Sequence, residues 1–288
     1  MGGDGVHAAG RQPVGIRRSD RHGLFLLLDQ GASLAPAGPR AGVGGRDGDG
    51  GAKRMTTGPE TSLAALDGAS ASTPVVIAQL GQTLDGRIAT VTGASKYISG
   101  RESLKHLHRV RASVDAVLVG VGTVAADDPQ LTVRHVEGRD PVRVVLDPKG
   151  RIPRDAAMLR DGRGEVLVVC APGVETPPGV AALRLEPDAR GCFAPRQVAE
   201  ALAARGLPRI LLEGGAETLA RFLDAGAVDL LHVLVAPMIL GSGKPGIRLR
   251  PVERLADALR PQTEVHVLPD GDVLFACDLR PRRLEAAE

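Results

Sequence analysis

Short, almost uninterrupted runs of aliphatic residues restrict the fold of this chain more than any other feature. Three of them, at residues 116–120, 142–146 and 166–170, consist mostly of Val, Leu and Ala. A strand with one face in water alternates polar and apolar residues, whereas continuous apolar runs are typical of strands buried on both faces. We therefore predict a largely parallel sheet inside the protein.

Helix and turn signals alternate with these runs. Near the C-terminus, two extended segments flank Pro269-Asp-Gly-Asp, which is typical of a hairpin and makes the last strand pair antiparallel. Together these signals predict an α/β protein with a mixed, mostly parallel sheet. The further elements predicted are strands at 75–80, 210–212, 230–235, 264–268 and 273–277, and helices at 101–114, 197–204 and 216–223.

Composition changes sharply near residue 74. Residues 1–73 hold 16 of the 37 glycines and show no sustained hydrophobic period. Such a segment cannot bury enough apolar surface to offset its chain entropy, so we predict disorder for it. One interpretation is a functional tail. The simpler one is that Met55 is the true start, with residues 56–73 a short leader. Residues 74–283 are then predicted to form one domain.

Composition also excludes several classes of function. Aromatic residues make up 2% of the chain and the formal net charge is +2, so neither nucleic acid nor an anionic membrane is an expected partner. The three cysteines have no CxxC spacing, which predicts no metal site and a reducing, cytoplasmic compartment. No apolar stretch is long enough to cross a bilayer, and the run at 24–28 is too short for a secretory signal.

Two glycine turns are the first candidate ligand-binding features. One predicted strand leads into Gly120-Val-Gly-Thr, and another leads into Glu213-Gly-Gly and then a helix. Glycines at the carboxyl end of a strand let a ligand approach the backbone, and free N–H groups at a helix start bind anions such as a diphosphate. Each turn alone is equally compatible with a simple tight turn. Two in one α/β domain favour a nucleotide-type ligand, although neither matches a Rossmann or Walker motif.

Four side chains near the first glycine turn in the sequence are candidates for ligand contacts. Asp127 could cap the backbone or hold a ribose hydroxyl, and Arg134 could bind a phosphate with two hydrogen bonds. Arg111, on the predicted helix, could add to that phosphate contact. Either arginine taken alone is more simply a solvated surface residue. Tyr97, the only tyrosine, could cover a planar ring, although a core tyrosine is the ordinary interpretation.

Six motifs in a fixed order over residues 74–280 resemble one family, the reductase domain of the riboflavin biosynthesis protein RibD, which is related to dihydrofolate reductase. The resemblance implies a three-layer α/β/α fold and a homodimer. It also implies that NADPH reduces the ribosylamino group of 5-amino-6-(5-phosphoribosylamino)uracil. The motifs are L-D-G-R-I-A at 84–89, G-x-S-x-Y-I-S-G at 93–100, D-A-V-L-V-G-V-G-T-V-x-x-D-D-P-x-L-T-V-R at 115–134, R-V-V-L-D at 143–147, L-L-E-G-G-x-x-T-L at 211–219, and V-D-L followed by A-P-x-x-L-G-x-G at 228–243.

The resemblance further implies roles for single residues. Glu213 would contact the substrate near the point of hydride transfer and act as acid or base. Lys149 and Arg151 are candidates for the ribose 2′-phosphate of NADPH. The residues implied for the substrate are Ser95, Arg111, Leu131, Arg134 and Glu213. Those implied for NADPH are Gly81, Tyr97, Gly122, Thr123, Asp127, Gly214, Gly215, Ala216, Glu217 and Thr218.

Three features depart from the family pattern. Residues 1–73 have neither H-x-E nor P-C-x-x-C, so no deaminase half is expected. Gln79 stands where many members carry Lys, and Pro148 stands where the family has a small hydroxyl residue. These changes keep two alternatives open: a reductase of the same fold acting on a pterin or another heterocycle, and a catalytically silent nucleotide-binding module. The presence of both Arg111 and Arg134 favours the phosphorylated riboflavin precursor.

Overall fold

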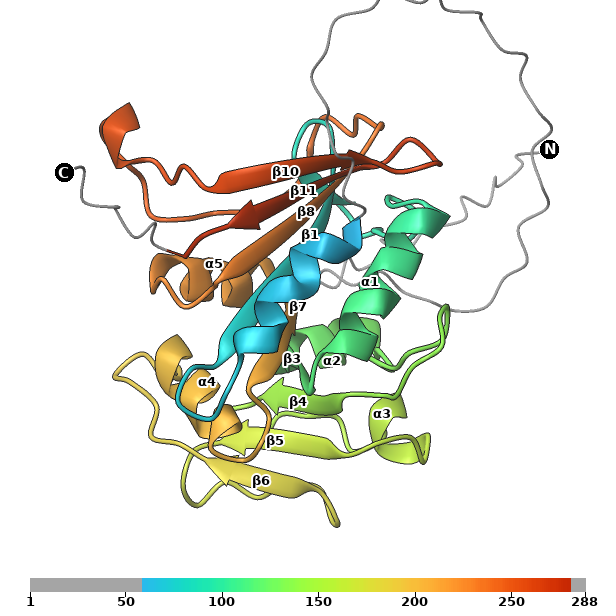
Figure 1. Ribbon diagram of the computed structural model, residues 1–288. Helices are drawn as coiled ribbons and strands as arrows, with labels where there is room; N and C mark the ends of the chain where they lie inside the picture. Colours follow the sequence, from blue (N-terminus) through green and yellow to red (C-terminus); the bar gives the residue numbers. More distant parts are fainter. Residues whose placement is uncertain (1–58, 281–288) are drawn as a thin grey trace, which may run out of the picture.

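A nine-stranded mixed sheet forms the centre of the molecule (Figure 1). The computed structural model describes residues 59–280. The strands of the sheet are β1 (Val75–Thr83), β3 (Ala116–Gly120), β4 (Val142–Leu146), β5 (Val166–Cys170), β6 (Ala181–Arg184), β7 (Arg209–Glu213), β8 (Leu230–Ala236), β10 (Gln262–Val267) and β11 (Val273–Asp278). Their order is β10-β11-β8-β1-β7-β3-β4-β5-β6. All neighbours are parallel except β11, which is antiparallel to both β8 and β10.

Helices cover both faces of this sheet. On β1, Val76 and Ala78 pack into a cluster with residues of α4 (Pro195–Ala203) and α5 (Ala216–Asp224). Val75 and Ile77 point the other way, into a cluster with residues of α1 (Arg101–Ser113), α2 (Val121–Asp127) and α3 (Ala157–Arg160). Successive residues of a strand face opposite sides, so an uninterrupted apolar strand serves two cores at once. The predicted three-layer α/β/α arrangement is confirmed.

Several smaller elements differ from the prediction. The strands β3, β4 and β5 have the predicted bounds, but β6 was not predicted, and neither was the small sheet of β2 (Arg87–Thr90) and β9 (Gly243–Pro245). The first glycine turn is also shorter than expected, because α2 begins at Val121, directly after β3. Gly122 and Thr123 therefore lie in the first turn of a short helix.

The segment predicted to be disordered contains an ordered element, η1, a 3-10 helix at Pro59–Gly68. Leu66 of η1 is buried in the same cluster as Leu107 of α1. The expectation of disorder is therefore corrected for this part of the segment, because a few apolar residues suffice for packing when a neighbouring helix supplies the rest of the surface. Met55 and the residues before it lie outside the described residues.

The hairpin between β10 and β11 caps the start of α1. Asp272 is buried, and its Oδ2 accepts hydrogen bonds from the Gly100 backbone N–H at 2.7 Å and from the Ser103 hydroxyl at 2.5 Å. Asp270 accepts one from the Glu102 backbone N–H at 2.8 Å. A helix start leaves N–H groups without partners, and here the carboxylates come from a segment about 170 residues away.

Replacing Asp272 by alanine is expected to lower the free energy of unfolding by about 2 to 3 kcal/mol, since two buried donors lose a charged acceptor. Urea denaturation of wild type and variant measures the loss. Asp270→Ala is the matched control, because its single contact is exposed, and it is expected to cost about 1 kcal/mol or less. Equal losses for the two variants would contradict this assignment.

Candidate active site

A polar row crosses three neighbouring strands on the α1 side of the sheet. Gln79 of β1 lies in register with Glu213 of β7 on one side and with His232 of β8 on the other. One step back along the same face, the corresponding residues Ile77, Leu211 and Leu230 all belong to the apolar core. The polar row therefore marks where the core ends, towards the carboxyl ends of the strands, where α/β proteins bind ligands.

Glu213 forms a buried ion pair with Arg111 of α1. Nε of Arg111 lies 2.7 Å from Oε1 of the carboxylate, and Nη2 lies 2.8 Å from Oε2. Nη1 donates to the Thr132 carbonyl at 2.9 Å. The Arg111 side chain is 2% exposed and that of Glu213 is 4% exposed. The guanidinium of Arg111, which the resemblance assigns to the substrate phosphate, contacts the Glu213 carboxylate and joins it to the loop at Thr132.

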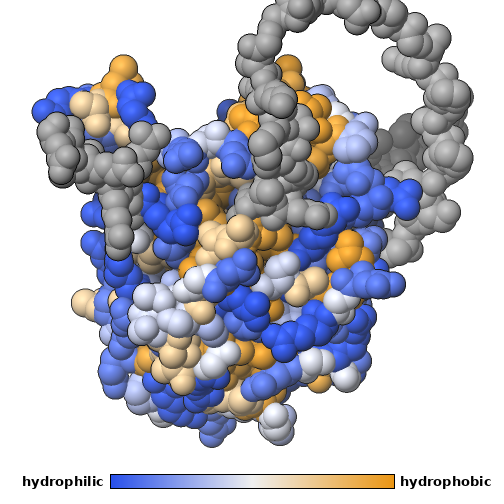
Figure 2. Space-filling view, viewed as in Figure 1, coloured by the Kyte–Doolittle hydropathy of each residue, from blue (hydrophilic) through white to orange (hydrophobic). Residues whose placement is uncertain are grey.

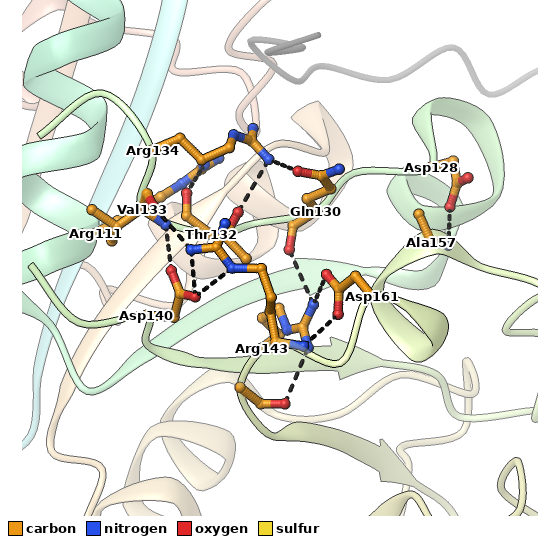
Figure 3. A network of polar contacts seen from close by, with 12 residues as sticks. Arg111, Asp128, Gln130, Thr132, Val133, Arg134, Asp140, Arg143, Ala157 and Asp161 are labelled. Carbon is orange, nitrogen blue, oxygen red and sulfur yellow. Dashed lines mark hydrogen bonds and ion pairs between the residues drawn. The ribbon is translucent and has the colours of Figure 1, made fainter. Parts of the chain in front are cut away.

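The loop 128–134 carries Leu131 and Arg134, two of the three remaining residues expected to hold substrate (Figure 3). Leu131 is buried and has a φ of 57°, which places it in the left-handed region that residues other than glycine rarely adopt. In Figure 3, Arg134 extends along this loop, and its Nη1 contacts the side-chain oxygen of Gln130 and the Thr132 hydroxyl, the latter at 3.1 Å. The arginine is therefore held over the same loop that Arg111 anchors.

The two glycine turns lie against each other. A Cβ atom placed on Gly120, at the end of β3, would be 2.8 Å from the Thr218 hydroxyl in the first turn of α5. Gly214 and Gly215, which precede α5, have φ values of 62° and 72°. Glycine adopts this left-handed conformation at no steric cost. The structure thus brings together two segments that are about 95 residues apart in the sequence, as expected for parts of one binding site.

Two polar atoms beside these turns are buried without a hydrogen-bond partner in the part of the chain described. They are the Thr123 hydroxyl and Oδ2 of Asp127. Burial raises the pKa of Asp127 to about 7, and the charge of Lys244 opposes this shift. Buried polar groups normally have a partner. A buried hydroxyl and carboxyl oxygen without partners fit the hydroxyl and amide groups of a polar ligand.

The remaining predicted residues are more scattered. Gly81 is buried within β1, and Ala216 and Glu217 begin α5, where Glu217 pairs with Arg221 at 3.0 Å. Ser95 and Tyr97 lie in the loop before α1. Tyr97 is exposed and has a φ of 71°. Among the described residues, no hydrogen bond joins either of them to Glu213.

Sequence reasoning named Gln79 only as a departure from the family pattern, and it did not single out His106, His232 or the role of Arg143. The amide atoms of Gln79 are buried without a partner in residues 59–280, and His232 beside it accepts or donates a hydrogen bond with His106 at 3.1 Å. Arg143, read only as part of a strand, is buried under the loop. A charged residue inside a run of valines was the available signal.

Replacing Gly120 by alanine is expected to weaken about tenfold the binding of the NADPH that the family resemblance implies, because the new methyl group displaces the Thr218 side chain at the start of α5. A fluorescence titration of NADPH measures the dissociation constant. The double variant Gly120→Ala/Thr218→Ala removes the clashing hydroxyl, so it should bind as Thr218→Ala alone does. Unchanged NADPH binding by Gly120→Ala would show that the two turns do not form one site.

No group of three or more His, Cys, Asp and Glu side chains in residues 59–280 is arranged to hold a metal ion. No helix in the same range is long and apolar enough to span a membrane.

The sheet, the paired glycine turns and the buried carboxylate at a strand end define an α/β domain with a candidate site for a nucleotide-type ligand. The model of one family, the RibD C-terminal domain, matches residues 74–265. The chain belongs to this family.

Similar proteins are known in archaea and bacteria. The chain is 39% identical over 197 residues to the 2,5-diamino-6-ribosylamino-4(3H)-pyrimidinone 5′-phosphate reductase of Methanothermobacter thermautotrophicus, covering 65% of this chain and 89% of that protein. It is 38% identical over 176 residues to RibD of Aquifex aeolicus, covering 59% of this chain but only 48% of that protein. The chain thus spans about half of such RibD relatives.

A solved structure shares the fold. It is a diaminohydroxyphosphoribosylaminopyrimidine deaminase/5-amino-6-(5-phosphoribosylamino)uracil reductase of Thermotoga maritima, with a TM-score of 0.61 and 31% identity over 72% of this chain and 57% of that one. Neither alternative considered above, a pterin reductase or a silent nucleotide-binding module, is favoured by these relatives.

Proposed function

We propose that this chain is an NADPH-dependent reductase of riboflavin biosynthesis, acting on a ribosylaminopyrimidine 5′-phosphate. The observation that supports this most is the Arg111–Glu213 pair, because it joins a carboxylate at the end of β7 to the loop that carries Arg134. The relative from Methanothermobacter thermautotrophicus, 89% of which is covered, is named as a reductase of the 2,5-diamino pyrimidinone phosphate. The substrate predicted from the family is the corresponding deaminated uracil.

In this proposal the protein mainly holds its two ligands. Opening of the ribosylamine ring gives an imine, and NADPH, when bound, supplies the hydride that reduces it. Arg134 binds the substrate phosphate, and Glu213, oriented by Arg111, contacts the substrate and exchanges the proton at the transfer point. The start of α5 with Gly214 and Gly215 binds the diphosphate, and Thr123 and Asp127 bind further polar groups of the cofactor.

The test is NADPH consumption by the purified chain with each of the two pyrimidine phosphates. We expect turnover with at least one of them and slower turnover with NADH. Arg134→Ala should raise KM at least tenfold, because a charged contact to phosphate is lost. Arg205→Ala is the control and should behave as wild type, because this exposed side chain donates to the Ala182 carbonyl on the α4 side of the sheet.

Other outcomes have definite meanings. NADPH binding without turnover of either pyrimidine would overturn the proposed substrate and direct the search to pterins. If the chain does not bind NADPH, the proposal that it is an NADPH-dependent reductase is overturned. A KM unchanged by Arg134→Ala would remove the phosphate contact from the proposal.

We also propose that the chain forms a homodimer in the cytoplasm. The strand β10 is at the edge of the sheet, and its Val265 and Val267 are exposed. Next to it, the segment around η2 (Leu255–Asp257) projects from the body of the protein, with apolar and charged residues side by side (Figure 2). Exposed edge strands with apolar side chains are pairing surfaces. Sedimentation of the purified chain tests this, and a monomer would contradict it.

A further inference from the structure

Guanidinium groups from a helix, a strand and a loop hold the backbone of the loop 128–134. The carbonyl of Gln130 accepts a hydrogen bond from Arg143 of β4 at 3.4 Å, and that of Thr132 accepts one from Arg111 of α1 at 2.9 Å. The carbonyl of Val133 accepts one from Arg163 at 3.2 Å. The loop is therefore fixed by side chains rather than by a neighbouring strand.

The conformation of the loop requires such support. Leu131 is left-handed with a φ of 57°, a conformation that is strained for a residue with a Cβ. It lies between Gln130 and Thr132, the two residues whose carbonyls are held by buried guanidinium groups. Strained residues persist where their surroundings determine the backbone on both sides.

Arg143 is the less expected of these anchors. It is 1% exposed and lies within β4, between the buried strands β3 and β5. Its Nη1 lies 2.6 Å from Oδ2 of Asp161, and its Nη2 donates to the Gly164 carbonyl at 3.1 Å. A buried ion pair is weak support for stability, because an apolar residue in the same place often serves as well or better. The position of its contacts therefore points to another role.

Those contacts lead to Arg134. Arg143 holds the backbone carbonyl of Gln130, and the side-chain oxygen of the same Gln130 accepts a hydrogen bond from Arg134 (Figure 3). We propose that Arg143, paired with Asp161, is a positioning residue for substrate binding: it sets Gln130, which in turn aims Arg134 at the substrate phosphate. This inference rests on the proposed function.

The test is binding of the ribosylaminopyrimidine phosphate and of its dephosphorylated form, measured by calorimetry on wild type and Arg143→Met. We expect about tenfold weaker binding of the phosphorylated ligand and unchanged binding of the dephosphorylated ligand and of NADPH. In turnover, KM should rise while kcat changes little. Combined with Arg134→Ala, the substitution should add no further loss.

Two further variants separate positioning from folding. Arg143→Lys keeps the charge and should retain part of the phosphate-dependent binding even if Arg143→Met is poorly folded. Arg209→Met is the matched control, since Arg209 pairs with Asp115 at 2.6 Å at the amino end of β7 and touches no part of the loop. It should leave binding of both ligands unchanged.

The inference is overturned if Arg143→Met binds the phosphorylated ligand as wild type does. It is also overturned if both ligands lose affinity equally, or if the loss adds to that of Arg134→Ala, because a general structural role would act in that way. A wild-type protein that binds neither pyrimidine would instead overturn the proposed function, and this inference with it.

Discussion

Replacing Arg111 by methionine is expected to lower the free energy of unfolding by about 3 to 5 kcal/mol and to abolish turnover. The substitution leaves the Glu213 carboxylate buried without its two charge-assisted hydrogen bonds, and it leaves the Thr132 carbonyl without its donor. A single buried charge costs far more than the pair contributes. Urea denaturation measures the stability, and NADPH consumption measures the activity.

The double variant Arg111→Met/Glu213→Leu separates the two effects. With both charges removed, most of the lost stability should return, because the two apolar side chains can pack against the core residues Ile77, Leu211 and Leu230. Activity should not return, since the carboxylate at the end of β7 is gone. A fully active double variant would remove Glu213 from the proposed mechanism. A stable and active Arg111→Met would show that the ion pair has neither role.

Acidification from pH 7 to pH 5 is expected to cost about 3 to 4 kcal/mol of stability through two buried histidines, His232 of the polar row and His106 of α1. Burial lowers the pKa of His106 to about 3, and the charges of His232, Arg109 and His266 add to this shift. Burial lowers the pKa of His232 to about 4, with a further contribution from His266. Both imidazoles therefore stay neutral in the native protein.

The direction follows from proton binding. In the unfolded chain both histidines take up protons below about pH 6.5, while in the folded chain they do so only near pH 3 to 4. Their full contribution to stability is therefore present above pH 6.5 and is lost as the pH falls. Urea midpoints measured between pH 5 and pH 8 follow this loss directly.

A matched variant isolates the histidines from the carboxylates that also titrate. In His106→Gln/His232→Asn, amide groups replace Nε2 of His106 and Nδ1 of His232, the atoms that share the 3.1 Å hydrogen bond. Neither amide titrates, so the loss of stability between pH 7 and pH 5 should be smaller than in wild type by the same 3 to 4 kcal/mol. An unchanged pH dependence would show that the pair does not control acid stability.

The sequence alone was enough to predict the layer architecture, most elements and the two glycine turns. These features depend on short-range signals: an aliphatic run such as that of β5 forms a buried strand, and glycines such as Gly214 and Gly215 permit a left-handed turn. The motif order also sufficed to recognise the family, which the match over residues 74–265 confirms. The roles assigned to single site residues remain predictions.

Weak local signals explain the elements that were missed. The four residues of β6 include two alanines, and the three of β9 include Gly243 and Pro245, so neither has a strand pattern of its own. Each becomes a strand because a stronger neighbour, β5 or β2, supplies hydrogen-bonding partners. The segment η1 is ordered in the same way, through the surface of α1 and the neighbouring strands.

What the chain determined locally was which residues form strands, helices and turns; what only the tertiary structure decided was which side chains meet. Arg111 forms an ion pair with Glu213, which is 102 residues away in the sequence. Gln79 lies between Glu213 and His232 because β1 pairs with β7 and β8 in this register. The pairing register depends on the packing of the whole sheet, and a shift by one residue would turn each side chain to the opposite face. No local pattern encodes that choice, so the polar row and the Arg143 contacts become visible only in the folded protein.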